Sequence, residues 1–386
     1  MIEVQDIFKQ YGSEYIQNHI LSNAQYRAFQ DILNCRTAAF GGHVNICDEC
    51  GHKVISYNSC RNRHCPKCQT IKKEQWIEKQ EQYLLDVRYF HVVFTIPDDL
   101  NPLIYQNQKA LYTIFFKAVS ETLLELGRNK KYLGAKLGIT TILHTWGQNL
   151  SYHPHIHCVI PGGGLTDDGR WVYSRKKFFI PVKVLSKKFR GKFLALLRQA
   201  KLEFNGSVKE LGIPSNFDLF ISALYRKAWV TYCKPPFGNA SKVVAYLGRY
   251  THRVAISNNR ILKLENGRVT FKWRDYRDNK IKEMSVTAEE FIRRFLMHIL
   301  PPKFSKIRHY GILASKDKAT RIALCKKLTN TPVYAVGTPR KPLDIIRELL
   351  GDKFDLCPRC GIGHLIEISS FKPSALARAS PVQATA

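Results

Sequence analysis

The amino-acid sequence predicts an α+β fold, and three observations lead to this prediction. Short stretches in which apolar and polar residues alternate, as strands require, occur at 88–100, 140–146 and 153–158. Longer stretches with apolar residues at helical spacing lie between and after them, at 103–127 and 186–211. Pairs of cysteines with the spacing Cys-x2-Cys stand near both ends of the chain, outside these patterns. We therefore expect a mixed core with smaller cysteine-containing regions beside it.

The composition limits what kind of protein this is. Its 386 residues are enough for two or three domains, and 60 Lys and Arg against 31 Asp and Glu give a net charge of +29. Such a surplus predicts a polyanionic partner, with nucleic acid favoured over an anionic membrane surface. Because the sequence has no apolar run of membrane-spanning length and no signal-peptide pattern, we expect a soluble cytoplasmic protein. Eleven cysteines, an odd number, favour metal binding over a disulfide framework.

The first 85 residues are predicted to form helices over 1–38 and then a zinc-binding module. Two Cys-x2-Cys pairs separated by 14 residues present four thiolates, and four thiolates can close the tetrahedral shell of one zinc ion. The predicted ligands are Cys47, Cys50, Cys65 and Cys68. Cys60 and His64, with His43 and His52 nearby, could complete a second site or replace a ligand of the first.

The zinc-binding module is also basic. Arg61, Arg63 and Lys67 lie within it, and Lys72 and Lys73 follow at its exit. A module of this charge can hold the phosphates of a nucleic acid, and we name Arg61 and Arg63 as candidate DNA-binding residues. A zinc ion that only stabilises a small domain is compatible with the same residues.

A helix over 72–85 then leads into the first alternating strand, which Pro97 ends. The strand at 140–146 continues through Gly147 and Gln148 into the histidine-rich stretch HPHIHCVIPGGG, residues 153–164. Alternation places His153, His155 and His157 on one face of that strand. Two imidazoles two residues apart on a strand can hold one divalent metal ion. The spacing alone is weak evidence in a chain with 13 histidines.

The segment after a strand at 228–232 carries two tyrosines four residues apart. Ser241 can cap a helix in which Tyr246 and Tyr250 share one face. Arg249 and Arg253 flank them and could hold phosphates, although solvated helix charge explains these two residues equally well.

Beyond this helix, residues 254–286 read as a β-meander with hairpin turns, and a helix at 288–300 and a basic loop at 301–311 follow. Residues 312–368 form a basic region with one Cys-x2-Cys pair, Cys357 and Cys360. This pair is half a metal site, and His364 or Cys325 could complete it. The tail, 369–386, is rich in Ala, Ser and Pro, and we expect it to be disordered.

Taken together and in this order, these motifs make the chain resemble the HUH endonuclease superfamily and, within it, the IS91-type transposases. The stretches that carry the resemblance are SCRNRHCPKCQ (59–69), HVVFTIP (91–97), HTWGQNLSYHPHIHCVIPGGG (144–164), YLGRYTHRVAISN (246–258) and FIRRFLMHILPPKFSKIRHYG (291–311). The resemblance implies an HUH-type antiparallel sheet flanked by helices. It also implies a catalytic domain over 86–311, between the zinc-binding module and the C-terminal zinc-knuckle-like region.

The resemblance further implies a reaction. Tyr246 and Tyr250 would nick and join single-stranded DNA through a 5′-phosphotyrosine, at the ends of an insertion sequence and at its target, during rolling-circle transposition. If Tyr250 were the sole nucleophile, Tyr246 would be a packing residue. His155 and His157 would hold Mg²⁺ or Mn²⁺, with Gln148, His144 or His153 as the third ligand. The sequence contains no P-loop motif, so strand displacement would depend on host replication proteins at the bacterial nucleoid.

Three alternatives remain open at this point. A plasmid or phage replication initiator, or a relaxase, would share the same chemistry, although the N-terminal zinc module favours a transposase. A non-enzymatic zinc-finger regulator would explain the charge and the cysteines but not the ordered histidines and tyrosines. A hydrolase that uses water would form no covalent adduct with DNA.

Overall fold

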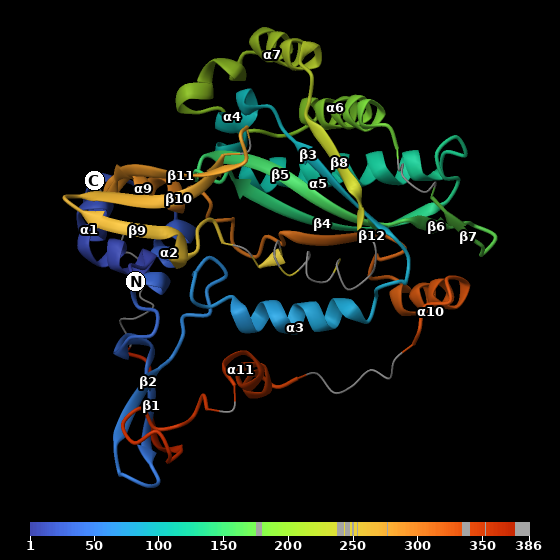
Figure 1. Ribbon diagram of the computed structural model, residues 1–386. Helices are drawn as coiled ribbons and strands as arrows, with labels where there is room; N and C mark the ends of the chain where they lie inside the picture. The colour runs from blue at the N-terminus through green and yellow to red at the C-terminus, as the bar shows by residue number, and fades with distance from the viewer. Residues whose placement is uncertain are drawn as a thin grey trace.

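The computed structural model describes residues 1–174, 180–237, 243, 248, 251–252, 254–275, 277–333, 340–351 and 353–374. Within them the chain has the predicted α+β fold, in which antiparallel sheets are packed against helices (Figure 1). No helix in these residues is both long and apolar enough to cross a membrane.

A seven-stranded antiparallel sheet forms the centre of the molecule. Its strands follow the order β7-β6-β4-β5-β3-β8, and β12 pairs with β4 beside this path. The bounds are β3 Tyr89–Thr95, β4 Lys136–Trp146, β5 Tyr152–Pro161, β6 Gly163–Leu165, β7 Trp171–Tyr173, β8 Thr231–Phe237 and β12 Ile307–Gly311. The histidine-rich strand β5 is therefore interior to the sheet, with β4 on one side and β3 on the other.

Helices cover one face of this sheet. They are α4 Asn101–Gln106, α5 Gln108–Arg128, α6 Val182–Arg198 and α7 Pro214–Arg226, and Figure 1 shows α5 and α6 along the sheet with α7 outermost. Phe94 of β3 and Ile156 of β5 are buried in the core that this face shares with Phe115 and Phe189. Because side chains alternate along a strand, His91 and His157 point to the opposite face.

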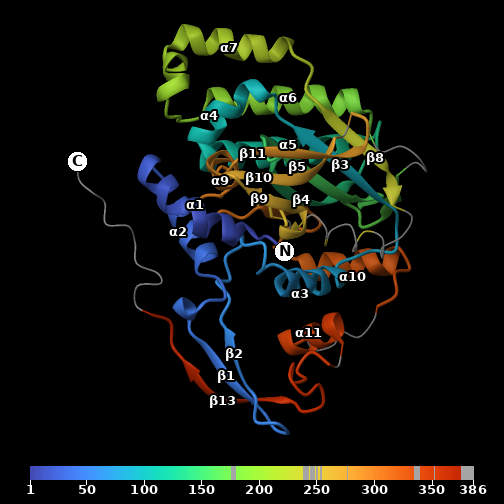
Figure 2. The same cartoon turned by 60° about the vertical axis from the view of Figure 1, so that its left-hand side comes forward.

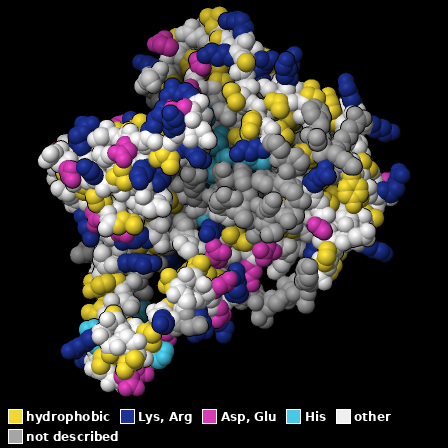
Figure 3. Space-filling model, in the orientation of Figure 1, with side chains coloured by type: hydrophobic (Ala, Val, Ile, Leu, Met, Phe, Trp, Pro, Cys, Tyr) yellow, Lys and Arg dark blue, Asp and Glu magenta, His cyan; other side chains and the backbone are white. Residues whose placement is uncertain are grey.

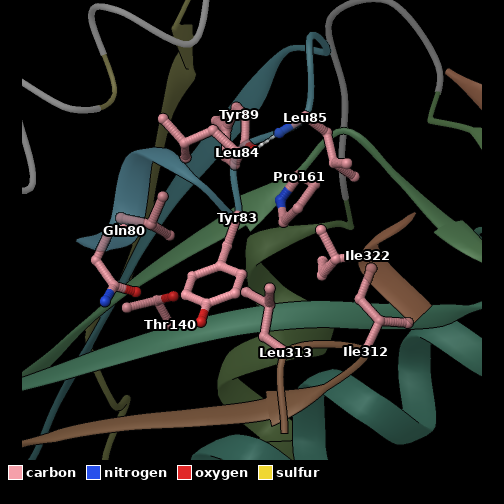
Figure 4. A pocket seen from close by; sticks show the side chains of 11 residues that line it. Gln80, Tyr83, Leu84, Leu85, Tyr89, Thr140, Pro161, Ile312, Leu313 and Ile322 are labelled. Carbon is pink, nitrogen blue, oxygen red and sulfur yellow. Dashed lines mark hydrogen bonds between the residues drawn. The ribbon is translucent and has the colours of Figure 1, made fainter. Parts of the chain in front are cut away.

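The opposite face is partly covered by segments from both ends of the chain. Helix α3 (Thr70–Glu81) and helix α10 (Lys318–Leu328) lie along it, and α11 (Pro342–Leu350) lies below α3 (Figure 1). Figure 4 shows the apolar contact: Tyr83 and Leu85 meet Pro161 of the sheet together with Ile312 and Ile322. The backbone N–H of Leu85 donates a 2.9 Å hydrogen bond to the Tyr89 hydroxyl. The residues that follow helix α3 thus pack on the sheet face that carries the histidines.

The N-terminal helices pack against a separate three-stranded sheet. This unit comprises α1 Val4–Asn18, α2 Asn23–Leu33, β9 Ile261–Glu265, β10 Arg268–Asp275, β11 Lys280–Thr287 and α9 Ala288–Leu296. The β-meander predicted over 254–286 is confirmed, with the order β11-β10-β9. Phe8 of α1 meets Phe295 of α9 edge to face, with ring centroids 5.5 Å apart. Residues assigned from sequence to the first domain therefore share a core with residues of the second.

The two ends of the chain form a third sheet that projects from the body. Strands β1 (Gly42–Cys47), β2 (Lys53–Tyr57) and β13 (Leu365–Phe371) pair in the order β13-β1-β2, and Figure 2 shows β13 beside β1. Because β13 continues to Phe371, ordered structure extends past the predicted tail boundary at 369. The rest of that tail, from 375, lies outside the described residues.

Several sequence-based element assignments need correction. The basic loop predicted at 301–311 contains strand β12, whose residues 307–311 pair with 142–138 of β4. Its five residues are too few, and too basic, for the alternation to stand out. The helix predicted over 186–211 ends at Arg198, and helix α7 was not predicted.

Candidate active site and metal centres

Three histidines converge on the sheet face that the helices α5 and α6 leave open. One ring nitrogen of each of His144, His155 and His157 lies within 4.8 Å of those of the other two. The sheet register explains this, since His144 of β4 pairs directly with His155 of β5, and His157 follows two residues on. Figure 3 shows histidine side chains in the middle of this face, with Lys and Arg side chains near them.

Hydrogen bonds orient two of the three rings. Nδ1 of His155 lies 2.7 Å from the backbone oxygen of His153, so this nitrogen carries the proton and Nε2 keeps the lone pair. Nδ1 of His157 lies 2.9 Å from Nε2 of His91. Burial lowers the pKa of His91 to about 3, which keeps that ring neutral and able to accept a hydrogen bond.

The donor set fits a divalent metal ion. His144 and His157 are buried, at 2% and 7% exposure, and His155 is half-buried. His144 is further held by stacking on Trp146, with centroids 4.7 Å apart. Three imidazoles that meet within one ion's reach are a ligand set for Zn²⁺ and other divalent transition-metal ions. Neither an Asp nor a Glu of the described residues belongs to this cluster.

The structure also places the other candidates for the third ligand. His153 stands apart from the cluster, with Nδ1 3.6 Å from a carboxylate oxygen of Asp98. Gln148 lies in the turn after β4, where its backbone oxygen accepts a hydrogen bond from Arg260. Of the histidines proposed from sequence for this role, His144 is the one that joins His155 and His157.

Tyr246, Tyr250, Arg249 and Arg253 lie outside the described residues. Val243 and Gly248, which lie close to them in sequence, are described. The structure therefore bears on this part of the candidate site only through residues that are close to the tyrosines in sequence.

Val243 is fully buried against the sheet, in a cluster that includes Ile142 and Val159. Ile142 pairs with His157, and Val159 follows His157 by two residues on the same face. A Cβ added to Gly248 would lie 2.5 Å from Cδ1 of Ile77, so the backbone at Gly248 approaches α3 closely. Val243 thus lies on the histidine face of the sheet, and Gly248 lies against α3.

A cavity of about 190 Å³ opens where α3 begins. Basic side chains line it from both sides, with Lys73 from α3 and Arg260 from the loop before β9. His252, just after the tyrosine segment, also lines it, and its ring lies 5.9 Å from that of Trp76. This cavity is suited to an anionic group, and His252 in its lining follows Tyr250 by two residues in sequence.

The cysteines form two clusters of four instead of the single site predicted from the two N-terminal pairs. The first contains Cys35, Cys60, Cys65 and Cys68, and the second contains Cys47, Cys50, Cys357 and Cys360. The expectation that both N-terminal pairs share one ion is wrong, because strand β13 brings the C-terminal pair to Cys47 and Cys50. Cys35 was not predicted as a ligand, since it stands alone after α2 with no partner at knuckle spacing.

The sulfur spacings fit zinc. The Sγ atoms of Cys35 and Cys68 are 3.5 Å apart, and those of Cys47 and Cys360 are 3.7 Å apart. A tetrahedral ion with Zn–S bonds of about 2.3 Å requires sulfurs about 3.8 Å from one another. His64 is not a member of either cluster, and its Nε2 accepts a 3.3 Å hydrogen bond from the Leu300 N–H.

The two candidate DNA-binding arginines of the zinc module have different surroundings. Arg63 donates hydrogen bonds to the backbone oxygens of Pro301, at 2.9 Å, and Phe304, so its guanidinium joins the module to the central domain. Arg61 is exposed, and its backbone oxygen accepts a hydrogen bond from Lys72. Arg61 therefore remains accessible to a ligand, whereas Arg63 is committed to internal contacts.

Comparison with known proteins gives two matching families. The family described as "Putative transposase" matches residues 138–320, which contain the three histidines and the tyrosine segment. The family described as "Transposase zinc-binding domain" (Zn_Tnp_IS91) matches residues 7–96, which contain the first cysteine cluster and half of the second.

Two relatives match over most of their length. "Putative transposase y4qJ" of Sinorhizobium fredii is 45% identical over 379 residues, which cover 96% of this chain and 95% of that protein. "Transposase for insertion sequence element IS801" of Pseudomonas savastanoi pv. phaseolicola is 28% identical over 306 residues, which cover 77% of this chain and 72% of that protein. No solved structure matches.

Proposed function

This chain belongs to the IS91 family of transposases, and we propose that it nicks and joins single-stranded DNA through a 5′-phosphotyrosine intermediate during rolling-circle transposition. As a transposase it acts on DNA, and its net charge of +29 suits that substrate. The observation that carries the proposal is the position of Val243. It packs in an apolar cluster with Ile142, which pairs with His157, and it stands three residues before Tyr246.

We assign the nucleophile to Tyr246 and Tyr250. The phenolate oxygen of one tyrosine forms a bond to the scissile phosphorus, and the bond from phosphorus to the 3′ oxygen breaks. The tyrosine loses its proton, and the departing 3′ oxygen gains one. The new linkage remains a phosphate diester, so a later attack by a 3′ hydroxyl can rejoin the strand without ATP. The second tyrosine would cleave at the end of transfer and release the element.

His144, His155 and His157 would hold the divalent metal ion. When bound, Mg²⁺ or Mn²⁺ would act as a Lewis acid that polarises the scissile phosphate and favours attack by a tyrosine, whose pKa is normally about 10. Three imidazole nitrogens suit Mn²⁺ better than Mg²⁺, which prefers oxygen ligands. Burial of His144 and His157 in the sheet would keep these two rings in place for the ion.

The cysteine clusters support structural zinc, and we assign one ion to each. The first cluster would fix the loop that precedes α3, and the second would join β1 to the C-terminal pair. The candidate contacts to phosphates are the exposed Arg61 and two arginines outside the described residues, Arg249 and Arg253. The DNA ends and the target would be single-stranded, and strand displacement would depend on host replication proteins. The protein would act in the cytoplasm, at the bacterial nucleoid.

An adduct assay tests this function. End-labelled single-stranded oligonucleotides that carry an element terminus are incubated with the zinc-loaded protein and Mn²⁺, and the products are separated in SDS. We expect an adduct that disappears in Tyr246→Phe with Tyr250→Phe, and in His155→Ala with His157→Ala. His309→Ala is the control, since this half-buried histidine of β12 lies outside the cluster.

Other outcomes point elsewhere. Metal-dependent cutting without an adduct would identify water as the nucleophile and contradict the proposal. Tight DNA binding with neither cutting nor adduct would favour a non-enzymatic zinc-finger regulator. An adduct formed only at a plasmid or phage replication origin would favour a replication initiator.

A further inference from the structure

His91 lies against His157 on the neighbouring strand. Nε2 of His91 and Nδ1 of His157 are 2.9 Å apart, and the two rings are nearly parallel, at 14°, with centroids 5.1 Å apart. His157 pairs with Val93 of β3, which places His91 diagonally across from it on the same face. His91 is buried, at 1% exposure, and does not belong to the three-histidine cluster.

The contact determines which nitrogen of His157 can bind a metal ion. If His91 accepts a hydrogen bond at Nε2, then His157 must carry its proton on Nδ1, and its lone pair is on Nε2. Ligand histidines in metal sites commonly donate their second ring N–H in this way, which fixes both tautomer and orientation. If His91 were replaced by a residue that cannot accept, the Nδ1–H of His157 would lose this hydrogen bond. The His157 ring could then carry its proton on Nε2 instead.

His155 obtains the same support from its own strand. Its Nδ1 lies 2.7 Å from the backbone oxygen of His153, so the fold of β5 is sufficient to orient it. His157 instead depends on a side chain of β3. A substitution at His91 can therefore alter one ligand selectively, which makes the contact testable.

We propose that His91 is a positioning residue, which accepts the hydrogen bond from His157 Nδ1 and holds Nε2 of His157 toward His144 and His155. His91 thereby strengthens metal binding without being a ligand. This inference rests on the proposed function to the extent that the three imidazoles must hold a divalent cation.

The test is Mn²⁺ affinity of the full-length, zinc-loaded protein, measured by calorimetry and by the electron paramagnetic resonance signal of free Mn²⁺. His91→Phe keeps a ring but removes the acceptor, and we expect Mn²⁺ affinity to fall about 10- to 100-fold. His309→Phe is the matched control. It also removes a half-buried imidazole of this sheet, one that lies 3.1 Å from the Thr140 hydroxyl, and it should leave Mn²⁺ affinity unchanged.

Conservative variants separate positioning from packing. In His91→Gln the side-chain oxygen can reach the position of Nε2, and we expect most of the affinity to return. In His91→Asn the amide is too short to reach it, so affinity should stay low. This pair decides the question even if His91→Phe does not fold.

The failure of this inference differs from the failure of the proposed function. If the wild-type protein shows no Mn²⁺ site that His155→Ala with His157→Ala removes, both are overturned. If that site exists but His91→Phe binds Mn²⁺ as tightly as wild type, or Gln and Asn behave alike, only the positioning role is overturned.

Discussion

Histidines in this protein differ in their partners, and those partners separate candidate ligands from structural residues. His144, His155 and His157 converge on one another. His298 is equally buried, yet its two ring nitrogens lie 3.2 Å from the Thr145 hydroxyl and 3.2 Å from the Leu150 backbone oxygen. Burial alone therefore does not identify a metal ligand. What identifies one is a ring nitrogen directed at other rings while the second nitrogen is held by a hydrogen bond.

His298 should make the protein sensitive to acid. Burial lowers the folded-state pKa of His298 to about 4, whereas the pKa of a histidine in the unfolded chain is about 6.5. As pH falls between these values, the unfolded chain binds a proton that the folded chain does not, so the free energy of unfolding decreases, by up to about 3 kcal/mol. This stabilisation is fully present above the unfolded pKa. Urea unfolding across this pH range measures it.

His298→Gln is the comparison, because glutamine can donate and accept hydrogen bonds but does not titrate. The variant should lose less stability than wild type over the same pH interval, whatever its stability at neutral pH. Equal losses in the two proteins would show that other groups cause the acid sensitivity.

Gly248 should be essential for the close approach of its own backbone to α3. Its missing side chain leaves room for Ile77, and Gly248→Val would overpack this contact, at a cost of about 1–3 kcal/mol or a displaced segment. We expect a lower melting temperature or a reduced adduct yield, and partial recovery when Ile77→Ala is added. Gly191→Val, at an open position on α6, is the control. No recovery in the double variant would contradict the contact.

At the scale of elements, the ends of the chain depend on each other. Strand β1 pairs with β13, and Cys50 meets Cys357, which lies 307 residues later. The sequence identifies Cys357 and Cys360 as half a site, but it contains no local signal for their partners. The Cys-x2-Cys spacing predicts that two cysteines share one turn. Which second pair completes the site depends on strand pairing between distant parts of the chain.

Zinc content should follow the two clusters. Cys357→Ser with Cys360→Ser should reduce bound zinc from two ions per chain to one, with little change in the melting temperature of the body. Cys60→Ser with Cys65→Ser should also remove one ion, but it should lower the melting temperature, because both residues are buried in the core with α1 and α9. Elemental analysis and thermal unfolding measure these outcomes.

The alternative arrangement predicts a different pattern. If Cys47, Cys50, Cys65 and Cys68 shared one ion, the Cys357 and Cys360 substitutions would leave the zinc content unchanged. Zinc loss from only one of the two variants would likewise contradict one of the two sites.

Over the whole molecule, local sequence patterns predicted the helices and strands better than they predicted which of these elements lie side by side. The alternation in β3, β4 and β5 and the hairpin turns of the β-meander are visible in sequence and are confirmed. The pairing of β12 with β4, and the packing of α1 on α9, involve residues far apart in the chain. Such contacts depend on which apolar faces meet, and periodicity in one segment does not contain that information.

The candidate site shows the same division. His155 and His157 follow from strand alternation, but the choice of His144 as their neighbour depends on the β4–β5 register. His91 carries no distinguishing spacing, and only the β3–β5 pairing places it beside His157. The assignment of Tyr246 and Tyr250 depends on the sequence and on the packing of Val243 and Gly248, which are close to them in sequence.

The most direct test of the covalent mechanism is to identify the residue joined to DNA. Trypsin cleaves after Lys242, Arg249 and Arg253, so it should place Tyr246 and Tyr250 in different peptides. After nuclease digestion of the purified adduct, mass spectrometry should find a 5′-linked nucleotide on one or both of these peptides. A nucleotide on any other residue, or metal-dependent cutting with no linked nucleotide, would contradict the tyrosine mechanism.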